Sequence, residues 1–403
     1  MAMFDTNTLS RTRRFQHISQ PGMAWRSFQS PNGPAEHFIL IESEPVGSFE
    51  HQIESVKQRY AAVLDELGLT EDSTQFRRIF VSDILNQADL VRQSTLARID
   101  PQVPVAISLV EQAPLSGSKL ALLAHHIEPD GQGTRSALST NQTLLERHGK
   151  THVWNTQLCD ENNEVPARPA ALQTEAAFDR LSATLAHLDG NLLDHCVRTW
   201  IYMKDVDIDY KDMVESRIRL FNRQGLTCDT HYIASTGIEG ACSHRADLIM
   251  MDAYSIVGLE PGQMDFLNDF NHLCSAGDYN VTFERGTRIG WRDRAHFYIS
   301  GTASIDTAGQ VVHRGDVLRQ LDVALDNVDA LLRSGGATLA NMMYLIVYLR
   351  DPSDTSAIRT RLAEIAPNIP AILVHGPVCR PEWLVEVEGI AMMQQHRPEL
   401  PVF

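Results

Sequence analysis

The residues best suited to acid–base chemistry lie near the carboxyl end of the chain, in the segment LVEVEG (384–389). Alternate side chains of a β-strand point to opposite faces, so Glu386 and Glu388 share one face. Burial disfavours the charged form of a carboxyl group and raises its pKa, which would let Glu386 keep a proton near neutral pH and act as a general acid. We interpret Glu388 as a surface residue; the alternative is a partner whose charge raises the pKa of Glu386 further.

Arginines elsewhere in the chain are candidates for binding the carboxylates of an anionic substrate. A planar guanidinium group can bind a carboxylate through two parallel hydrogen bonds. Arg285 and Arg380 are the main candidates, and Arg198 is a weaker third. Cys379 precedes Arg380 and has no histidine directly beside it in the sequence to activate it as a nucleophile. We therefore expect the Cys379 thiol to shape the catalytic pocket; a small buried hydrophobe is the alternative.

Composition excludes several classes of function. The net charge of −16 and the absence of a basic run argue against nucleic-acid binding. No stretch approaches the roughly 18 apolar residues of a membrane span, and the amino terminus lacks the apolar core of a signal peptide, so we expect a cytoplasmic protein. The cysteines form no CxxC pair, and His125, His126 and His244 lack a complete ligand set. We therefore expect no disulfide framework, no metal and no cofactor.

Three passages of the chain follow one frame, in which an amphipathic helix ends at a glycine and an apolar strand follows. Fifteen residues separate the glycine from a later aspartate each time, as Gly68 and Asp83, Gly190 and Asp205, and Gly336 and Asp351. A frame that recurs at this spacing predicts three tandem copies of one small domain.

The order of predicted elements is alike in the three copies. The first has helices over 49–67 and 88–99 and strands over 76–84, 104–110 and 119–127. The second has helices over 170–188 and 210–224 and strands over 151–159, 197–206, 231–238 and 247–257. The third has a hairpin over 279–306, helices over 317–332 and 355–365, and strands over 342–350, 371–378 and 384–393, while 126–150 and 258–278 are interpreted as connectors. Helices over one face of a mixed sheet predict an α+β architecture whose other faces pack together around a pseudo-threefold axis.

The third copy resembles the Rid family, also called YjgF or UK114. The resemblance rests on FYISGTASID (297–306), on 325–351 and on LVEVEGIA (384–391), and extends more weakly to the other copies. Rid subunits have a chorismate-mutase-like fold and form homotrimers with sites in the clefts between subunits, so the resemblance implies an intramolecular pseudo-trimer. Rid imine deaminases carry an arginine after a Pro-Ala pair. The matching places, 104–106, 233–235 and 370–372, supply none, which argues against ordinary imine hydrolysis.

A narrower resemblance is to the chorismatases, Rid-like enzymes that remove the enolpyruvyl side chain of chorismate as pyruvate. It rests on FERG (283–286), SGTAS (300–304), ASTGI (234–238) and CRPEWLVEVEG (379–389). The resemblance implies that Glu386 is the general acid, and Gly286 with Cys379 implies the subgroup that forms 3-hydroxybenzoate. Trp200-Ile201-Tyr202 stands where chorismatases usually carry a W-N-Y motif. The remaining residues that we place in the substrate-binding part are Tyr202, Ser235, Thr236, Ser300, Gly301 and Thr302.

These observations predict three Rid-like domains, over 1–130, 131–258 and 259–403, with the catalytic glutamate in the last. The expected activity is removal of the enolpyruvyl group of chorismate, or a close analogue, to give a hydroxybenzoate in secondary metabolism. The expected partner is a small anionic metabolite, and the expected state is a monomer. The alternatives are a Rid-like hydrolase or cyclase acting on another imine or carbonyl intermediate, and a non-catalytic Rid-type metabolite-binding protein.

Overall fold

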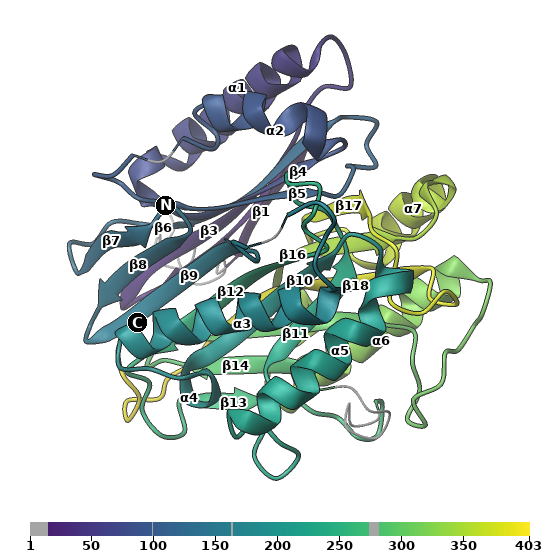
Figure 1. Cartoon of the computed structure of the whole chain (residues 1–403). Coiled ribbons are helices and arrows are strands. Elements are labelled where there is room, and N and C mark those ends of the chain that lie inside the picture. Colours follow the sequence, from purple (N-terminus) through teal and green to yellow (C-terminus); the bar gives the residue numbers. More distant parts are fainter. Residues whose placement is uncertain (1–14, 99, 163, 274–281) are drawn as a thin grey trace, which may run out of the picture.

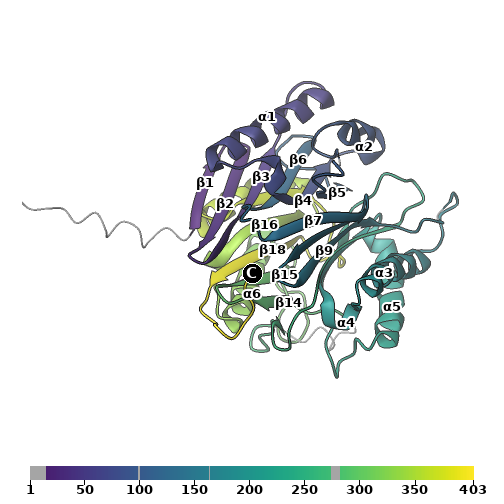
Figure 2. The same ribbon diagram turned by 90° about the vertical axis from the view of Figure 1, so that its left-hand side faces the viewer.

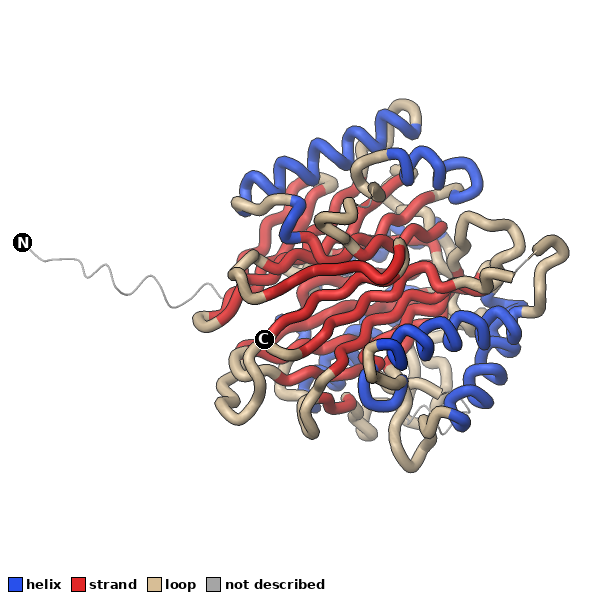
Figure 3. The backbone as a smooth tube through the Cα atoms, turned by 60° about the vertical axis from the view of Figure 1, so that its left-hand side comes forward, coloured by secondary structure: helices blue, strands red, loops and turns tan. Residues whose placement is uncertain are grey.

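Three six-stranded sheets meet in the interior of the molecule, and the helices lie on the outside (Figures 1 and 3). The computed structural model describes residues 15–98, 100–162, 164–273 and 282–403. Seen from the side, α1 and α2 cover the first sheet, and α3 and α5 cover the second on another flank (Figure 2). The α+β class and the three-repeat arrangement expected from the sequence are confirmed.

Repeat one forms a sheet with the strand order β1-β2-β3-β6-β4-β5. Strands β4 and β5 are parallel, and the other neighbours are antiparallel. Its elements are β1 (Phe15–Gln20), β2 (Met23–Ser30), β3 (Gly33–Glu42), α1 (Phe49–Leu67), β4 (Thr74–Val81), α2 (Ile84–Gln93), β5 (Ala106–Glu111) and β6 (Leu120–Ile127).

Repeats two and three reproduce this topology. Their strand orders are β7-β8-β9-β12-β10-β11 and β13-β14-β15-β18-β16-β17, each with one parallel pair at the edge. The elements of repeat two are β7 (Gly133–Ser139), β8 (Gln142–Arg147), β9 (Lys150–Leu158), α3 (Ala170–His187), α4 (Leu192–His195), β10 (Cys196–Met203), α5 (Val206–Arg223), β11 (Ala234–Glu239) and β12 (Ile249–Val257). Those of repeat three are β13 (Met264–Phe266), β14 (Gly286–Gly290), β15 (Arg294–Ala303), α6 (Val317–Ser334), β16 (Met342–Leu349), α7 (Thr355–Ile365), β17 (Ala371–His375) and β18 (Val385–Gln394).

The repeated glycine and aspartate have a structural reason. Gly68 ends α1 in the left-handed conformation, with φ 67°, which a glycine adopts without steric cost. The aspartates, predicted to close a strand, instead cap the helix that follows: the Asp83 and Asp205 side chains accept hydrogen bonds from main-chain N–H groups in the first turns of α2 and α5. Asp351 caps the short turn before α7 in the same way.

Two segments interpreted as connectors contain strands. The region 126–150 carries β7 and β8, and 258–278 carries β13. The prediction was wrong there because β7 is an edge strand whose side chains are almost all exposed, so its sequence has no apolar alternation. Residues 279–281 of the predicted hairpin lie outside the described residues. The proposed domain boundaries, 130/131 and 258/259, lie between β6 and β7 and between β12 and β13.

Aromatic side chains from all three repeats pack where the sheets meet. The rings of Phe38 and Tyr344 have centroids 5.4 Å apart, and Tyr254 lies 5.1 Å from Trp154 and 5.3 Å from Tyr298. These separations fall in the favourable range for aromatic pairs. The repeats therefore share a central core, and repeats one and two each have a further buried cluster beside it. Within the described residues, no helix has the length and apolar character needed to cross a bilayer.

Candidate active site

A cavity of about 490 Å³ lies between repeats two and three, large enough for a small metabolite. Helix α5 and strand β11 of repeat two form one wall. The other wall comes from repeat three, from the segment before β14, from β15, and from Cys379, Arg380, Trp383 and Glu386. The main sequence-predicted groups that line the cavity are Glu386, Cys379, Arg285, Arg380, Gly301, Ser235 and Thr236.

Glu386 lies on β18 at the bottom of this cavity and is only 5% exposed. Burial, together with the negative charge of Glu388, raises its pKa to about 8, although Arg198 and Arg285 act in the opposite direction. A Cβ atom added at Gly301 would lie 2.2 Å from Glu386 Oε1. The glycine therefore makes room for the carboxyl group, which holds a proton at neutral pH.

Glu388 is not the surface residue we expected. It is 1% exposed and accepts hydrogen bonds from Trp200 Nε1 at 2.9 Å and Tyr348 Oη at 3.0 Å. Thr236 donates to its other oxygen, and the same Thr236 hydroxyl accepts the Gly301 N–H at 2.8 Å. The two glutamates share a strand face, as predicted, but that face is buried between repeats rather than wet.

The charge of Glu388 is balanced by two arginines from other repeats. Arg198 Nη2 lies 2.7 Å from Glu388 Oε2, and Arg78 Nη1 lies 3.5 Å from Oε1. Arg78 also lies 3.4 Å from Asp252, so the network joins all three repeats. Arg198, expected as a third carboxylate clamp, is therefore engaged by a carboxylate of the protein, and the prediction was wrong. A buried charge needs partners of this kind.

The cavity has a basic wall. Arg285 is buried, with its guanidinium carbon 5.1 Å from the centre of the Phe283 ring. Arg380 is half-buried, lies over Trp383 and donates to the Gly309 carbonyl at 3.2 Å. Both guanidinium groups line the same cavity as the protonated Glu386, so an anion bound beside them would lie near a proton donor.

Cys379 also lines the cavity, on the side of α5. Burial and the nearby Glu386 raise the pKa of its thiol to about 12, and a hydrogen bond with Tyr210 only partly offsets this. The sulfur is therefore a neutral thiol at neutral pH, and the nucleophile is the thiolate. This agrees with a shaping role.

Sequence reasoning missed Arg217 on α5. Its side chain is buried, lines the cavity, and donates from Nε to Thr282 Oγ1 at 3.0 Å. The signal was available: Arg217 follows Met213 and Val214 by four and three residues, so it stands inside the apolar stripe of the helix. A charged residue at such a position is usually functional or paired.

The other predicted substrate-binding residues do not line the cavity. Ser300 accepts the Ser235 N–H at 2.9 Å and donates to the Glu284 carbonyl, which fixes the cavity wall. Thr302 donates to the Ser300 carbonyl. A Cβ atom at Gly286 would press within 3.1 Å of the Tyr298 carbonyl, so this glycine permits close strand packing. Tyr202 lies outside the cavity, with the Arg78 guanidinium 5.7 Å from its ring centre.

Comparisons with known proteins agree with this geometry. The endoribonuclease L-PSP family matches residues 289–393. A chorismatase of Streptomyces hygroscopicus is 29% identical over 210 residues, which span 48% of this chain and 60% of that protein, less than two thirds of its length. A 3-hydroxybenzoate synthase of the same organism is 25% identical over 270 residues, or 61% of this chain and 77% of that protein. The crystal structure of a chorismatase has a TM-score of 0.62 at 18% identity and covers 90% of this chain and 100% of that chain, so it shares the fold.

Proposed function

Because the chain belongs to the endoribonuclease L-PSP family, called Rid above, we propose that it is a chorismatase-like enzyme. It removes the enolpyruvyl group of chorismate, or of a close analogue, as pyruvate and leaves a hydroxybenzoate. The observation that carries the proposal is the buried Glu386 carboxyl, with a pKa of about 8, in a cavity of about 490 Å³ lined by arginines. The similarity to a chorismatase and to a 3-hydroxybenzoate synthase supports the choice of substrate.

The chemistry begins with proton transfer. Glu386 donates its proton to the methylene carbon of the enol ether, and the electron pair of the double bond forms the new C–H bond. The neighbouring carbon becomes an oxocarbenium ion, which the adjacent hydroxyl of the substrate ring attacks to form a cyclic ketal. The bond between this hydroxyl oxygen and the ring then breaks, and the oxygen leaves as the carbonyl oxygen of pyruvate while the ketal carbon releases the original ether oxygen, which stays on the ring. A ring proton is lost as the ring becomes aromatic, and Glu386 recovers a proton. Pyruvate and a hydroxybenzoate together contain the atoms of chorismate, so this outcome consumes no net water.

Chorismate carries two carboxylates, and the basic wall can bind them. Arg285 and Arg217 line the cavity and are buried, and Arg380 lines it and is half-buried. In this arrangement the arginines hold the enolpyruvyl carboxylate so that the adjacent enol ether lies within reach of Glu386, which protonates the methylene carbon. We assign 3-hydroxybenzoate as the product, supported by Gly286 and Cys379, which match the chorismatase subgroup that forms it.

We further propose a cytoplasmic monomer. The cysteines that the structure describes (Cys159, Cys196, Cys228, Cys242 and Cys379) are free thiols, as expected in a reducing compartment. The three repeats already cover one another's inner faces, which removes the reason for Rid-like domains to associate between chains. Light scattering after gel filtration should give the mass of one chain.

The test is to incubate the purified protein with chorismate, follow pyruvate through a coupled dehydrogenase, and identify the aromatic product by liquid chromatography. We expect pyruvate and 3-hydroxybenzoate in equal amounts from the wild type and a loss of both in E386Q. The matched control is E382Q, at a nearby half-buried glutamate that pairs with Arg314 and does not line the cavity, which should keep wild-type turnover. Absence of pyruvate from the wild type, or unchanged turnover in E386Q, would overturn the proposal.

A further inference from the structure

We call the cavity that holds Glu386, between repeats two and three, the acidic cleft. A second cleft, between repeats one and two, is built from corresponding elements. Its cavity of about 360 Å³ is lined by α2 and β5 of repeat one and, in repeat two, by the end of β9 and the loop after β11. The acidic cleft has the carboxyl group of Glu386 on β18, the last strand of its repeat, whereas the walls of the second cleft carry thiols. Cys159, Cys242 and Asp247 all line this cavity.

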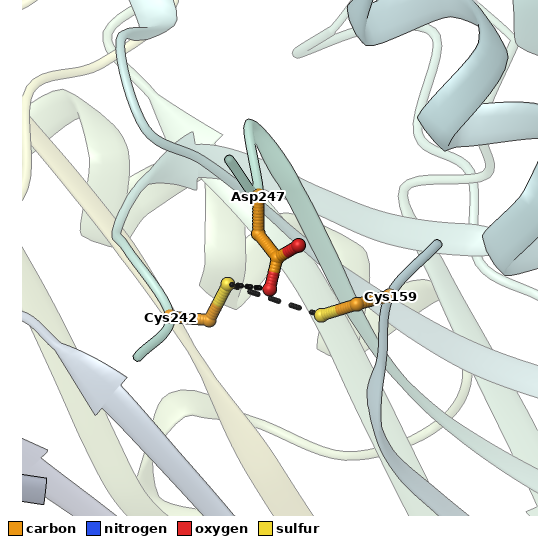
Figure 4. A group of neighbouring side chains, drawn as sticks. All are labelled: Cys159, Cys242 and Asp247. Carbon is orange, nitrogen blue, oxygen red and sulfur yellow. Dashed lines mark hydrogen bonds between the residues drawn. The ribbon is translucent and has the colours of Figure 1, made fainter. Parts of the chain in front are cut away.

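These three side chains come from two separate segments of repeat two and converge on one point (Figure 4). Cys242 Sγ lies 3.8 Å from Cys159 Sγ and 3.0 Å from Asp247 Oδ2. All three candidate ligand atoms lie within 4.8 Å of one another. Cys242 and Asp247 are buried, and Cys159 is half-buried.

This donor set matches the coordination chemistry of zinc. Two thiolates at about 2.3 Å from a tetrahedral zinc lie about 3.8 Å apart, and a carboxylate oxygen completes a third position at about 2.0–2.2 Å. We propose that Cys159, Cys242 and Asp247 bind one divalent cation of the zinc class in the cleft between repeats one and two. The fourth position opens on the cavity and takes water or a small anionic ligand.

Neighbouring side chains suit this role. His244 Nδ1 lies 3.5 Å from the other oxygen of Asp247, where it can orient the carboxylate as an outer-sphere partner. Arg92 reaches from repeat one to Ser243 Oγ, beside Cys242. Its positive charge offsets the net negative charge that two thiolates and one carboxylate leave on the bound cation.

Binding releases protons. Contact with Cys159, burial and the nearby Asp247 raise the pKa of the Cys242 thiol, and a bound cation would replace the proton on the Cys242 sulfur. A divalent cation displaces one proton from each thiol, forms two metal–sulfur bonds and one metal–oxygen bond, and changes no oxidation state. Affinity should therefore increase with pH.

The experiment is a cobalt titration of the full chain after chelator treatment and reduction with a phosphine. We expect a near-ultraviolet thiolate-to-cobalt charge-transfer band that saturates at one equivalent per chain and disappears when zinc is added. C159S and C242S should lose the band, and D247N should weaken binding. C228S, at an exposed thiol that is not part of the cluster, should keep the band unchanged.

A second measurement uses the wild type alone, so that it tests the site even if the cysteine variants fail to fold. In the wild type, zinc should slow alkylation of Cys159 and Cys242, read by mass spectrometry, and leave Cys228 unaffected. No band in the wild type, a band that survives in folded C159S and C242S, or alkylation insensitive to zinc would each overturn the proposal. Formation of a Cys159–Cys242 disulfide in place of metal uptake by the reduced protein would overturn it as well.

Discussion

The clefts on the two sides of repeat two have the same backbone plan and different chemistry. In one, α5 and β11 face β15 and the segment after β17; in the other, α2 and β5 face β9 and the segment after β11. The strand registers show which residues correspond. Glu386 pairs with Tyr348 as Met250 pairs with Tyr202, so Met250 occupies the place of the acid.

Two further positions complete the contrast. Thr302 pairs with Val387 as Leu158 pairs with Met251, which places Gln157 at the position of Gly301 and Cys159 at the position of Ala303. Gln157 adopts a φ of 52°, lines the second cavity and donates from its side chain to the Ile107 carbonyl of repeat one at 3.5 Å. The comparison teaches that a few side chains on a shared backbone decide whether a cleft holds a protonated carboxyl group or a pair of thiols.

The cleft between repeats three and one is different again. Arg359 of α7 lies 3.3 Å from Glu42 across it, and apolar Leu40 stands at the position of Gly301. The ion pair spans the entrance, and repeat one has Ala121 in place of an acid. The acidic cleft is thus one of three sites with one plan.

The largest loss of activity is expected when Glu386 is replaced by methionine, the residue at the matching position, 250, of the second cleft. E386M should lower the rate of pyruvate release from chorismate by about 10²- to 10⁴-fold, because the proton donor is lost. The reciprocal M250E should create no activity, since Gln157 stands at the position where Gly301 makes room for Glu386. Pyruvate release by M250E in an E386M background would break the comparison.

The next largest loss of activity is expected from a substitution at Gly301. A side chain at position 301 would collide with Glu386 Oε1, so G301A should displace the carboxyl group and cost about 10²-fold in kcat, the usual loss for a displacement of about 1 Å. G131A, at an exposed glycine where an added Cβ atom would meet no other atom within 4 Å, serves as the control. G301A with wild-type kcat would show that Glu386 needs no such space.

Removal of a buried arginine should have a smaller effect, concentrated in KM. R285Q and R217Q should each raise KM for chorismate by about 10- to 100-fold, the equivalent of losing a hydrogen bond to a charged group of about 1.5–3 kcal/mol. R92Q, in the other cleft, should leave KM unchanged. Equal KM values in all three variants would show that Arg285 and Arg217 do not bind the carboxylates of the substrate.

Much of this plan could be read from the sequence, and the reason is local. The helix–glycine–strand frame and the alternation of Leu384–Glu388 depend on residues near in sequence, so the repeats and the shared face of the two glutamates could be predicted. Whether that face meets water or another repeat depends on long-range packing. Glu388 was therefore misplaced, and the encounter of Cys159 with Cys242, 83 residues apart, could not be foreseen.

The pH dependence of activity follows from the proton on Glu386. Its pKa of about 8 predicts that kcat/KM stays level below pH 8 and falls tenfold per pH unit above it, because only the protonated form can donate. The profile of kcat/KM for chorismate from pH 6 to 10 checks this. A rise across that range would mean that the ionised carboxylate acts instead, as a base.

The same shift should also appear as a pH-dependent difference in stability. Because the pKa of Glu386 is raised on folding, the unfolded chain releases this proton near pH 4.5 and the folded chain near 8. Between these values the wild type should lose about 1.4 kcal/mol of unfolding free energy per pH unit relative to E386Q, whose amide does not titrate. Above pH 8 the difference should be constant. Denaturant unfolding of both proteins across this range measures it, with E382Q expected to follow the wild type. Parallel curves for wild type and E386Q would place the carboxyl group in water, and the acidic cleft would then differ from its counterpart in shape alone.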